Sequence, residues 1–121
     1  MEASFKHQLQ KTACKVRLGA LEAVYSGKSG HPGGSLSVAD ILTYLYFKEL
    51  RVDPKNPQWP ERDRFVLSKG HTCPALYAAL ALKGFFPWDE LKKFRHPGAM
   101  LQGHPDMKHI PGIDTVSYTH L

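Results

Sequence analysis

The stretch DRFVLSKGHTCPALYAALALKG, residues 63–84, decides the fold that we predict for this chain. Its first part, residues 63–68, is a short apolar run bounded by polar residues, which predicts a buried β-strand. A Gly-His pair at 70–71 follows directly. Residues 74–82 then predict an α-helix, because they begin with a proline, are largely apolar and are followed by a glycine. A strand, a glycine loop and a helix in this order indicate an α/β protein.

Two more helices are predicted before this stretch. Apolar residues recur at steps of three and four over residues 5–25, which is typical of an amphipathic helix. Residues 26–35 (SGKSGHPGGS) concentrate glycine and predict a loop. Residues 37–40 (SVAD) have the form of a capping box, and helical spacing of apolar residues continues from there toward Leu50.

The remaining sequence predicts mostly connectors. Residues 53–60 contain three prolines, which indicates an ordered connector without regular structure. A short helix is predicted over 87–94, and residues 95–112 are loop-like. Only one strand is predicted, and a single strand cannot make a sheet. We therefore expect the rest of a parallel sheet, flanked by helices, to come from sequence outside this chain, so that the α/β fold is incomplete.

The composition disfavours several classes of protein. The 121 residues are 42% hydrophobic, which is enough for a packed core, and the net charge of +5 lies in scattered residues without a dense basic run. A basic nucleic-acid-binding module, the rival class, would bind with steep salt dependence. Cys14 and Cys73 fit no metal or disulfide spacing. Without a bilayer-length apolar run or a secretory leader, we expect a soluble cytoplasmic protein with neither nucleic acid nor membrane as partner.

Three Gly-His pairs carry the chemistry that we predict. Gly70 and His71 follow a predicted strand and precede a helix, where anions bind in α/β proteins, so the backbone can approach a phosphate and the imidazole can donate to it. A histidine that merely satisfies a loop carbonyl is the alternative. Residues 30–34 also precede a helix and can cradle an anion, although they match neither a P-loop nor a dinucleotide fingerprint. His104, between glycine and proline, suits hydrogen bonding or proton transfer.

A metal site is the alternative for the C-terminal histidines. His96, His104, Asp106 and His109 lie within a short span, but neither a cysteine pair nor a His-Glu-x-x-His helix accompanies them. We therefore predict no metal ligand among the residues of this chain.

Residues 29–35 (SGHPGGS), 63–71 (DRFVLSKGH) and 101–106 (LQGHPD) resemble successive motifs of the transketolase family in order and spacing. Residues 51–57 (RVDPKNP) and the Trp-Pro pair at 59–60 resemble that family as well. The resemblance extends from about residue 8 to about residue 114. The Gly-Gly-Ser-Leu-Ser sequence after His31 is most similar to the N-terminal subunit of the split bacterial type.

This resemblance implies a thiamine diphosphate enzyme that moves a two-carbon ketol unit from a ketose phosphate to an aldose phosphate. It implies that His71, with Gly70, binds the cofactor diphosphate. It also implies that His31 and His104 are catalytic residues that face the substrate, bind its hydroxyls and help proton transfer. Arg95 is not assigned a role, because the sequence around it differs from the commoner Arg-Gln-Leu-Gly-Ser pattern of the family.

The resemblance further implies parts that these residues lack. Family members hold magnesium with a later Gly-Asp-Gly element and an asparagine, and they need a C-terminal domain or partner subunit in a homodimer or heterotetramer. We interpret residues 1–115 as a partial cofactor-binding domain, inactive alone and reliant on further chain for folding. Residues 116–121 are expected to be a tail foreign to the family, from a truncated or misassembled reading frame. A related thiamine diphosphate synthase or dehydrogenase stays an alternative, although such enzymes normally lack the three Gly-His motifs together.

Overall fold

The computed structural model describes residues 2–28, 32–104, 107 and 110–114. His31, Asp106, His109 and the expected tail at 116–121 lie outside the described residues. The elements are, in chain order, α1 (Ala3–Gly27), α2 (Pro32–Tyr44), a π-helical turn η1 (Leu45–Glu49), a 3-10 turn η2 (Gly70–Thr72), α3 (Cys73–Lys83) and a 3-10 helix η3 (Trp88–Lys93).

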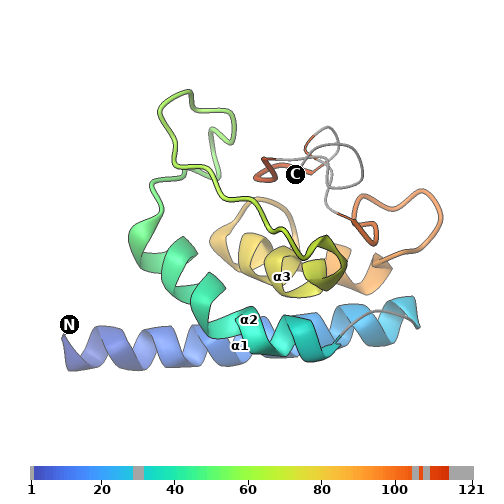
Figure 1. Ribbon diagram of the computed structural model, residues 1–121, viewed down its shortest axis with the longest axis horizontal. Helices are drawn as coiled ribbons and strands as arrows, with labels where there is room; N and C mark the ends of the chain where they lie inside the picture. Colours follow the sequence, from blue (N-terminus) through green and yellow to red (C-terminus); the bar gives the residue numbers. More distant parts are fainter. Residues whose placement is uncertain (1, 29–31, 105–106, 108–109, 115–121) are drawn as a thin grey trace.

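Helix α1 runs along one side of the molecule, and the other helices pack on it (Figure 1). Its buried face consists of small and medium residues, Ala13, Val16, Gly19, Ala20 and Ala23. At Gly19 the packing is close enough that a Cβ would lie 2.6 Å from the Trp88 ring and 2.8 Å from Ala78. The amphipathic helix predicted over 5–25 is therefore confirmed, and small residues let α3 and η3 approach it.

Helix α2 begins earlier than the sequence predicts. The capping box assigned to residues 37–40 is wrong, because Ser37 lies inside the helix and its hydroxyl donates to the Gly34 carbonyl at 2.9 Å. The helix instead begins at Pro32, whose fixed φ suits a first helical position. Its end is close to the prediction, since the π turn η1 carries the chain to Glu49.

Helix α3 matches its prediction and forms the centre of the core. Every residue from Cys73 to Leu80 is buried, so this helix is surrounded on all sides. It ends at Gly84, which has a φ of 107° and donates its N–H to the carbonyls of Leu80 and Ala81 at 3.1 Å. Glycine adopts this left-handed conformation without steric cost.

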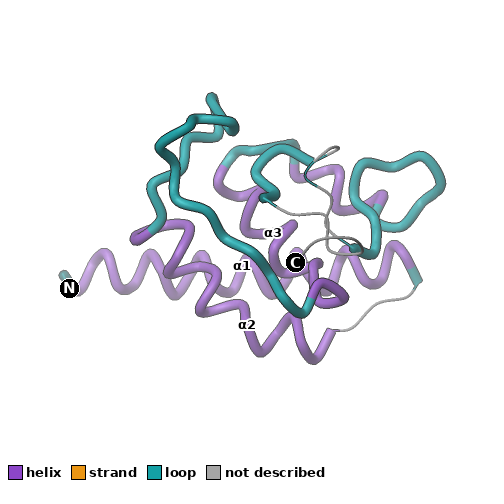
Figure 2. Tube along the Cα trace, turned by 45° about the horizontal axis from the view of Figure 1, so that its top comes forward, coloured by secondary structure: helices purple, strands orange, loops and turns teal. Residues whose placement is uncertain are grey.

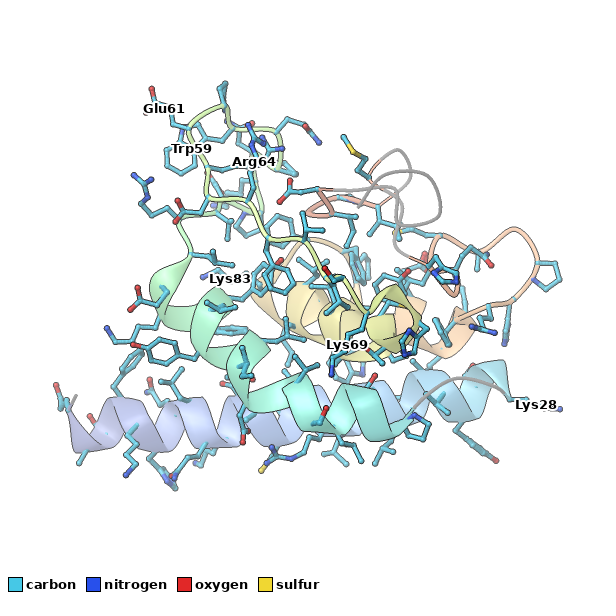
Figure 3. The ribbon with its side chains drawn as sticks, viewed as in Figure 1. Lys28, Trp59, Glu61, Arg64, Lys69 and Lys83 are labelled. Carbon is cyan, nitrogen blue, oxygen red and sulfur yellow. The ribbon has the colours of Figure 1, made fainter. Side chains whose placement is uncertain are left out.

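The segment between η1 and η2 combines turns with irregular chain and forms no strand. It first follows an outer bend, on which Trp59, Glu61 and Arg64 lie away from the helices (Figure 3), and then returns toward α3 without helix or turn over residues 62–67. Within the ranges described, no segment forms a strand, and the tube in Figure 2 consists of helices and loops. The strand predicted at 63–68 is not formed, because a strand requires a hydrogen-bonded neighbour and these ranges supply none.

The described residues after α3 follow the predictions closely. The short helix predicted over 87–94 is the 3-10 helix η3, with Pro87 at its N-terminal cap. The described residues after it form turns and loops. Of the helices in the described part, none is both long enough and apolar enough to cross a membrane.

Candidate functional site

The turn at the start of α3 presents the first Gly-His pair. Thr72 closes the turn, because its N–H and its hydroxyl both donate to the Lys69 carbonyl, at 2.9 and 2.8 Å. Gly70 is buried within the turn, whereas His71 is exposed. The imidazole of His71 is therefore presented at the N-terminal end of the buried helix α3, as the sequence predicts.

The N-terminal end of α2 packs directly on this turn. The Ser35 hydroxyl donates to the Thr72 carbonyl at 3.0 Å, and both side chains are buried. Gly34 lies so close to the Thr72 methyl group that no Cβ would fit there. The ammonium of Lys69 donates to the Gly34 carbonyl at 3.3 Å and to Ser37 Oγ at 3.2 Å, and Figure 3 shows Lys69 between the turn and α2. The residues that follow His31 are thus fixed against the residues around His71.

A third element reaches the same helix end from the C-terminal loop. The hydroxyl of Tyr77 donates to the Gln102 carbonyl at 2.6 Å, and the thiol of Cys73 donates to the Gly103 carbonyl at 3.2 Å. His104 follows directly and is exposed. We call residues 32–37, 69–73 and 102–104 the α3 junction. The elements that carry His71 and His104 meet there, together with the residues that follow the undescribed His31.

Arg95, to which the sequence assigns no role, is a neighbour of this junction. It has a φ of 63°, its N–H donates to the Leu101 carbonyl at 2.9 Å, and its guanidinium lies 5.6 Å from the centre of the Phe94 ring. A Cβ at Gly103 would lie 2.5 Å from its Nη2. The glycine before His104 was the available signal, because it allows a large side chain to pack on the backbone.

The α3 junction has the charge that suits an anion. Its described residues include Lys69 and two exposed histidines but no aspartate or glutamate, and Arg95 adds a guanidinium beside it. Cationic and N–H donors of this kind form strong, charge-assisted hydrogen bonds to phosphate oxygens. Burial raises the pKa of the Cys73 thiol to about 12, so this thiol keeps its proton and serves as a hydrogen-bond donor.

The alternative metal site finds no support in the described residues. Among them, no group of three or more histidine, cysteine, aspartate or glutamate side chains is placed to hold a metal ion. His96 instead lies against the end of α1, where its Nε2 donates to the Ser26 carbonyl at 3.0 Å. Asp106 and His109 lie outside the described residues.

The sequence matches one known family and several curated proteins. The family described as transketolase, thiamine diphosphate binding domain, matches residues 8–118. The 6-deoxy-6-sulfo-D-fructose transketolase subunit SqwG of Clostridium sp. (strain MSTE9) is 54% identical over 106 residues, which are 88% of this chain and 38% of that protein. The transketolase of Rhodobacter capsulatus is 44% identical over 109 residues, which are 88% of this chain and 16% of that protein.

Solved structures agree with the sequence relatives. A transketolase from Pichia stipitis in complex with sedoheptulose 7-phosphate superposes with a TM-score of 0.83 at 43% identity, over 87% of this chain and 16% of that one. A transketolase from Leishmania mexicana gives the same TM-score of 0.83 at 38% identity, again over 87% of this chain and 16% of that one. The chain therefore spans 38% of the length of the first of these relatives and 16% of the others.

Proposed function

The chain belongs to the transketolase family, as part of its thiamine diphosphate binding domain, and from this premise we propose that the α3 junction is one wall of a ketol-transfer site. The observation that carries the proposal is the meeting of residues 69–73 and 102–104 with the N-terminal end of α2 at one helix end. These three segments are more than 25 residues apart in sequence. Histidines in unrelated loops would not be expected to converge on one helix end.

The described residues fit the diphosphate of the cofactor. The imidazole of His71 is exposed, the ammonium of Lys69 is nearby, and the buried Gly70 carries no side chain that would keep a phosphate from the backbone. We assign cofactor binding to His71 and Gly70. When bound, thiamine diphosphate supplies the electron sink for breaking and making the ketol carbon–carbon bond. The described junction offers no carboxylate for Mg²⁺, so we propose that its ligands lie outside these residues.

His104 and His31 are proposed to act on the substrate. His104 is exposed beside the junction, and the main chain just before it is fixed by Tyr77 and Cys73. A neutral imidazole near pH 7 can hydrogen-bond a sugar hydroxyl and accept or return its proton. We assign this role to His104 and, on the family resemblance alone, to His31. The protein residues thus orient the sugar and move protons.

The substrates that we propose are a ketose phosphate donor and an aldose phosphate acceptor, as in the pentose phosphate pathway. A second candidate donor is 6-deoxy-6-sulfo-D-fructose, because the relative named for that sugar is 54% identical, against 44% for the transketolase of Rhodobacter capsulatus. We further propose a C-terminal partner subunit or domain, a homodimer or heterotetramer, and a cytoplasmic location. Neither a related thiamine diphosphate synthase nor a nucleic-acid-binding module is favoured by the relatives.

The test separates cofactor binding from turnover in the protein assembled with its partner. His71→Ala should weaken thiamine diphosphate binding about 10- to 100-fold, because it removes a hydrogen bond to a charged group. His104→Ala should leave the cofactor Kd within about twofold and lower kcat at least about 100-fold, since it removes a proton-transfer group. Cofactor titration by calorimetry and ketol transfer from each donor sugar provide the two measurements.

His7→Ala is the matched control, because His7 is an exposed histidine near the far end of α1. It should change neither quantity. Identical cofactor titrations for the wild type and His71→Ala would remove the cofactor assignment. Turnover unaffected by His104→Ala would remove the substrate assignment.

A further inference from the structure

Helix α3 holds the main chain just before His104 with two buried side chains. The hydroxyl of Tyr77 is 2.6 Å from the Gln102 carbonyl oxygen, and the sulfur of Cys73 is 3.2 Å from that of Gly103. We propose that Tyr77 and Cys73 are positioning residues, which fix these two consecutive peptide units and thereby set the direction of the His104 imidazole. This inference rests on the proposed role of His104 in ketol transfer.

The two donors are built into the core, so their directions are fixed. Tyr77 and Cys73 are both 0% exposed, and they stand one helical turn apart on the same face of α3. The Tyr77 ring packs edge-on against Phe94, with centroids 6.0 Å apart. Because both donors are fully buried, a carbonyl that moved away would leave a desolvated O–H or S–H without its compensating bond. Gln102 and Gly103 are therefore held strongly at this position.

The same segment is also held by Arg95 and by its own loop. The guanidinium of Arg95 packs on Gly103, where even a Cβ would not fit. The side-chain amide of Gln102 donates to the carbonyls of Ala99 at 2.8 Å and His96 at 3.2 Å, which closes the loop on itself. Residues 102–103 are thus clamped by α3, by Arg95 and by the loop itself, whereas His104, which follows, is exposed.

One helix therefore controls both functional histidines. The turn that presents His71 leads directly into Cys73, the first residue of α3, and the same helix fixes the peptide units before His104. A displacement of about 1 Å in a catalytic group can lower a rate by about 100-fold. Loss of the Tyr77 hydroxyl should consequently affect turnover while leaving cofactor binding intact.

Tyr77→Phe tests this in the protein assembled with its partner. It keeps the ring and removes only the hydroxyl, so we expect kcat to fall about 10-fold, with the cofactor Kd within about twofold of the wild type. The matched control is Tyr46→Phe, since Tyr46 is also buried, at 2% exposure, and packs against Phe65 away from the junction. The control should leave kcat unchanged. An equal loss in both variants would indicate general destabilisation and overturn the proposal.

Cys73 provides a second pair of variants. Cys73→Ser keeps a donor to Gly103 and should retain turnover within about threefold, whereas Cys73→Ala should lose about fivefold or more. If serine and alanine behave alike, the thiol does not position Gly103, and that half of the proposal fails even when Tyr77→Phe does not fold.

A structural readout separates this inference from the proposed function. In NMR spectra of the protein assembled with its partner, the amide signal of Gly103 and the ring signals of His104 should shift in Tyr77→Phe and stay in place in Tyr46→Phe. An assembled wild type without cofactor binding or turnover would refute the proposed function, and the NMR comparison would still decide whether the clamp exists. An active wild type whose kcat is unaffected by Tyr77→Phe overturns the positioning role.

Discussion

Cys14 and Cys73 are the same residue type in opposite surroundings. Cys14 is exposed on α1, where Arg17 Nη2 donates to its sulfur at 3.2 Å. Cys73 is fully buried, and burial raises the pKa of its thiol to about 12. The thiolate is the reactive form of cysteine, so a raised pKa lowers reactivity.

We predict that only one of the two thiols reacts in the folded chain. At pH 8, well below the raised pKa of Cys73, almost all of its side chains keep the proton, and the thiol is also shielded by burial. A colorimetric thiol reagent should therefore modify Cys14 quickly and Cys73 only after unfolding in denaturant. Cys14→Ser should abolish the fast phase; a fast phase that survives in this variant would show that Cys73 is accessible.

Local patterns reveal some site residues and hide others. The position of His71 at the start of a helix could be predicted, because the signals for that helix lie within a few residues of it. The contact between Cys73 and Gly103 joins residues 30 apart, so no local pattern reports it. The sequence around Arg95 differs from the family pattern and gives it no role, whereas the structure places its guanidinium against Gly103.

At the scale of elements, close approach depends on glycine at some helix positions and not at others. Gly19 on α1 lies against Trp88 and Ala78, at 2.6 and 2.8 Å from the position of a Cβ. A Cβ on Gly33 of α2 would meet nothing within 4 Å. The same substitution should therefore have opposite effects on the free energy of unfolding.

Gly19→Ala should destabilise the chain by about 1–2 kcal/mol. Alanine gains about 1 kcal/mol in helix propensity, but overpacking against Trp88 and Ala78 costs about 1–3 kcal/mol, and we expect the steric cost to prevail. Gly33→Ala should be neutral or stabilising by up to about 1 kcal/mol. Urea unfolding followed by circular dichroism measures both; a more stable Gly19→Ala variant would contradict the close packing.

Helix ends show why some elements could be predicted better than others. The bounds of α3 follow from a proline and a glycine whose conformational limits act locally. The start of α2 was misjudged, because Ser37 fits a capping box in sequence, whereas the helix is extended back to Pro32 by packing of Gly34 on Thr72. The strand at 63–68 had the right composition, but pairing depends on a neighbour that the described residues do not contain.

For the whole molecule, one buried ion pair ties the segment between η1 and η2 to the C-terminal end of the described chain. Arg62 Nη2 lies 3.1 Å from Asp114 Oδ1, and the two side chains are 10% and 9% exposed. The N–H of Phe65 donates to Asp114 Oδ2 at 3.1 Å. These bonds join residues 49 to 52 positions apart.

Asp114→Ala should lower the free energy of unfolding by about 3 kcal/mol, because it leaves Arg62 buried without its partner charge. If the free energy of unfolding of the wild-type chain is smaller than this loss, the Asp114→Ala variant should show no cooperative urea transition. The control is Asp89→Ala, which breaks an exposed pair with Lys92, 3.8 Å long, and should cost less than about 1 kcal/mol. Equal effects of the two variants would show that burial adds nothing to the Arg62–Asp114 pair.

The predicted parallel sheet also concerns the whole molecule, because it would cover helix faces that are exposed here. The relatives extend well beyond the segment that matches this chain. We still predict that the sheet lies in that further sequence. Several large apolar side chains are exposed on α1 and α2, among them Leu18 at 64%, Tyr25 at 76% and Ile41 at 59%. Whether the chain depends on further sequence for folding is likewise a prediction, which the urea transitions above address directly.

The pitch of α3 limits how this part of the sequence can vary in length. Cys73 and Tyr77 reach adjacent carbonyls because they are four residues apart on one face of a helix. One inserted residue between them would turn Tyr77 by about 100° and carry its hydroxyl away from Gln102. Insertions and deletions should therefore be tolerated in the exposed connector at 53–60 and rejected between His71 and Tyr77, where the number of residues matters as much as their identity.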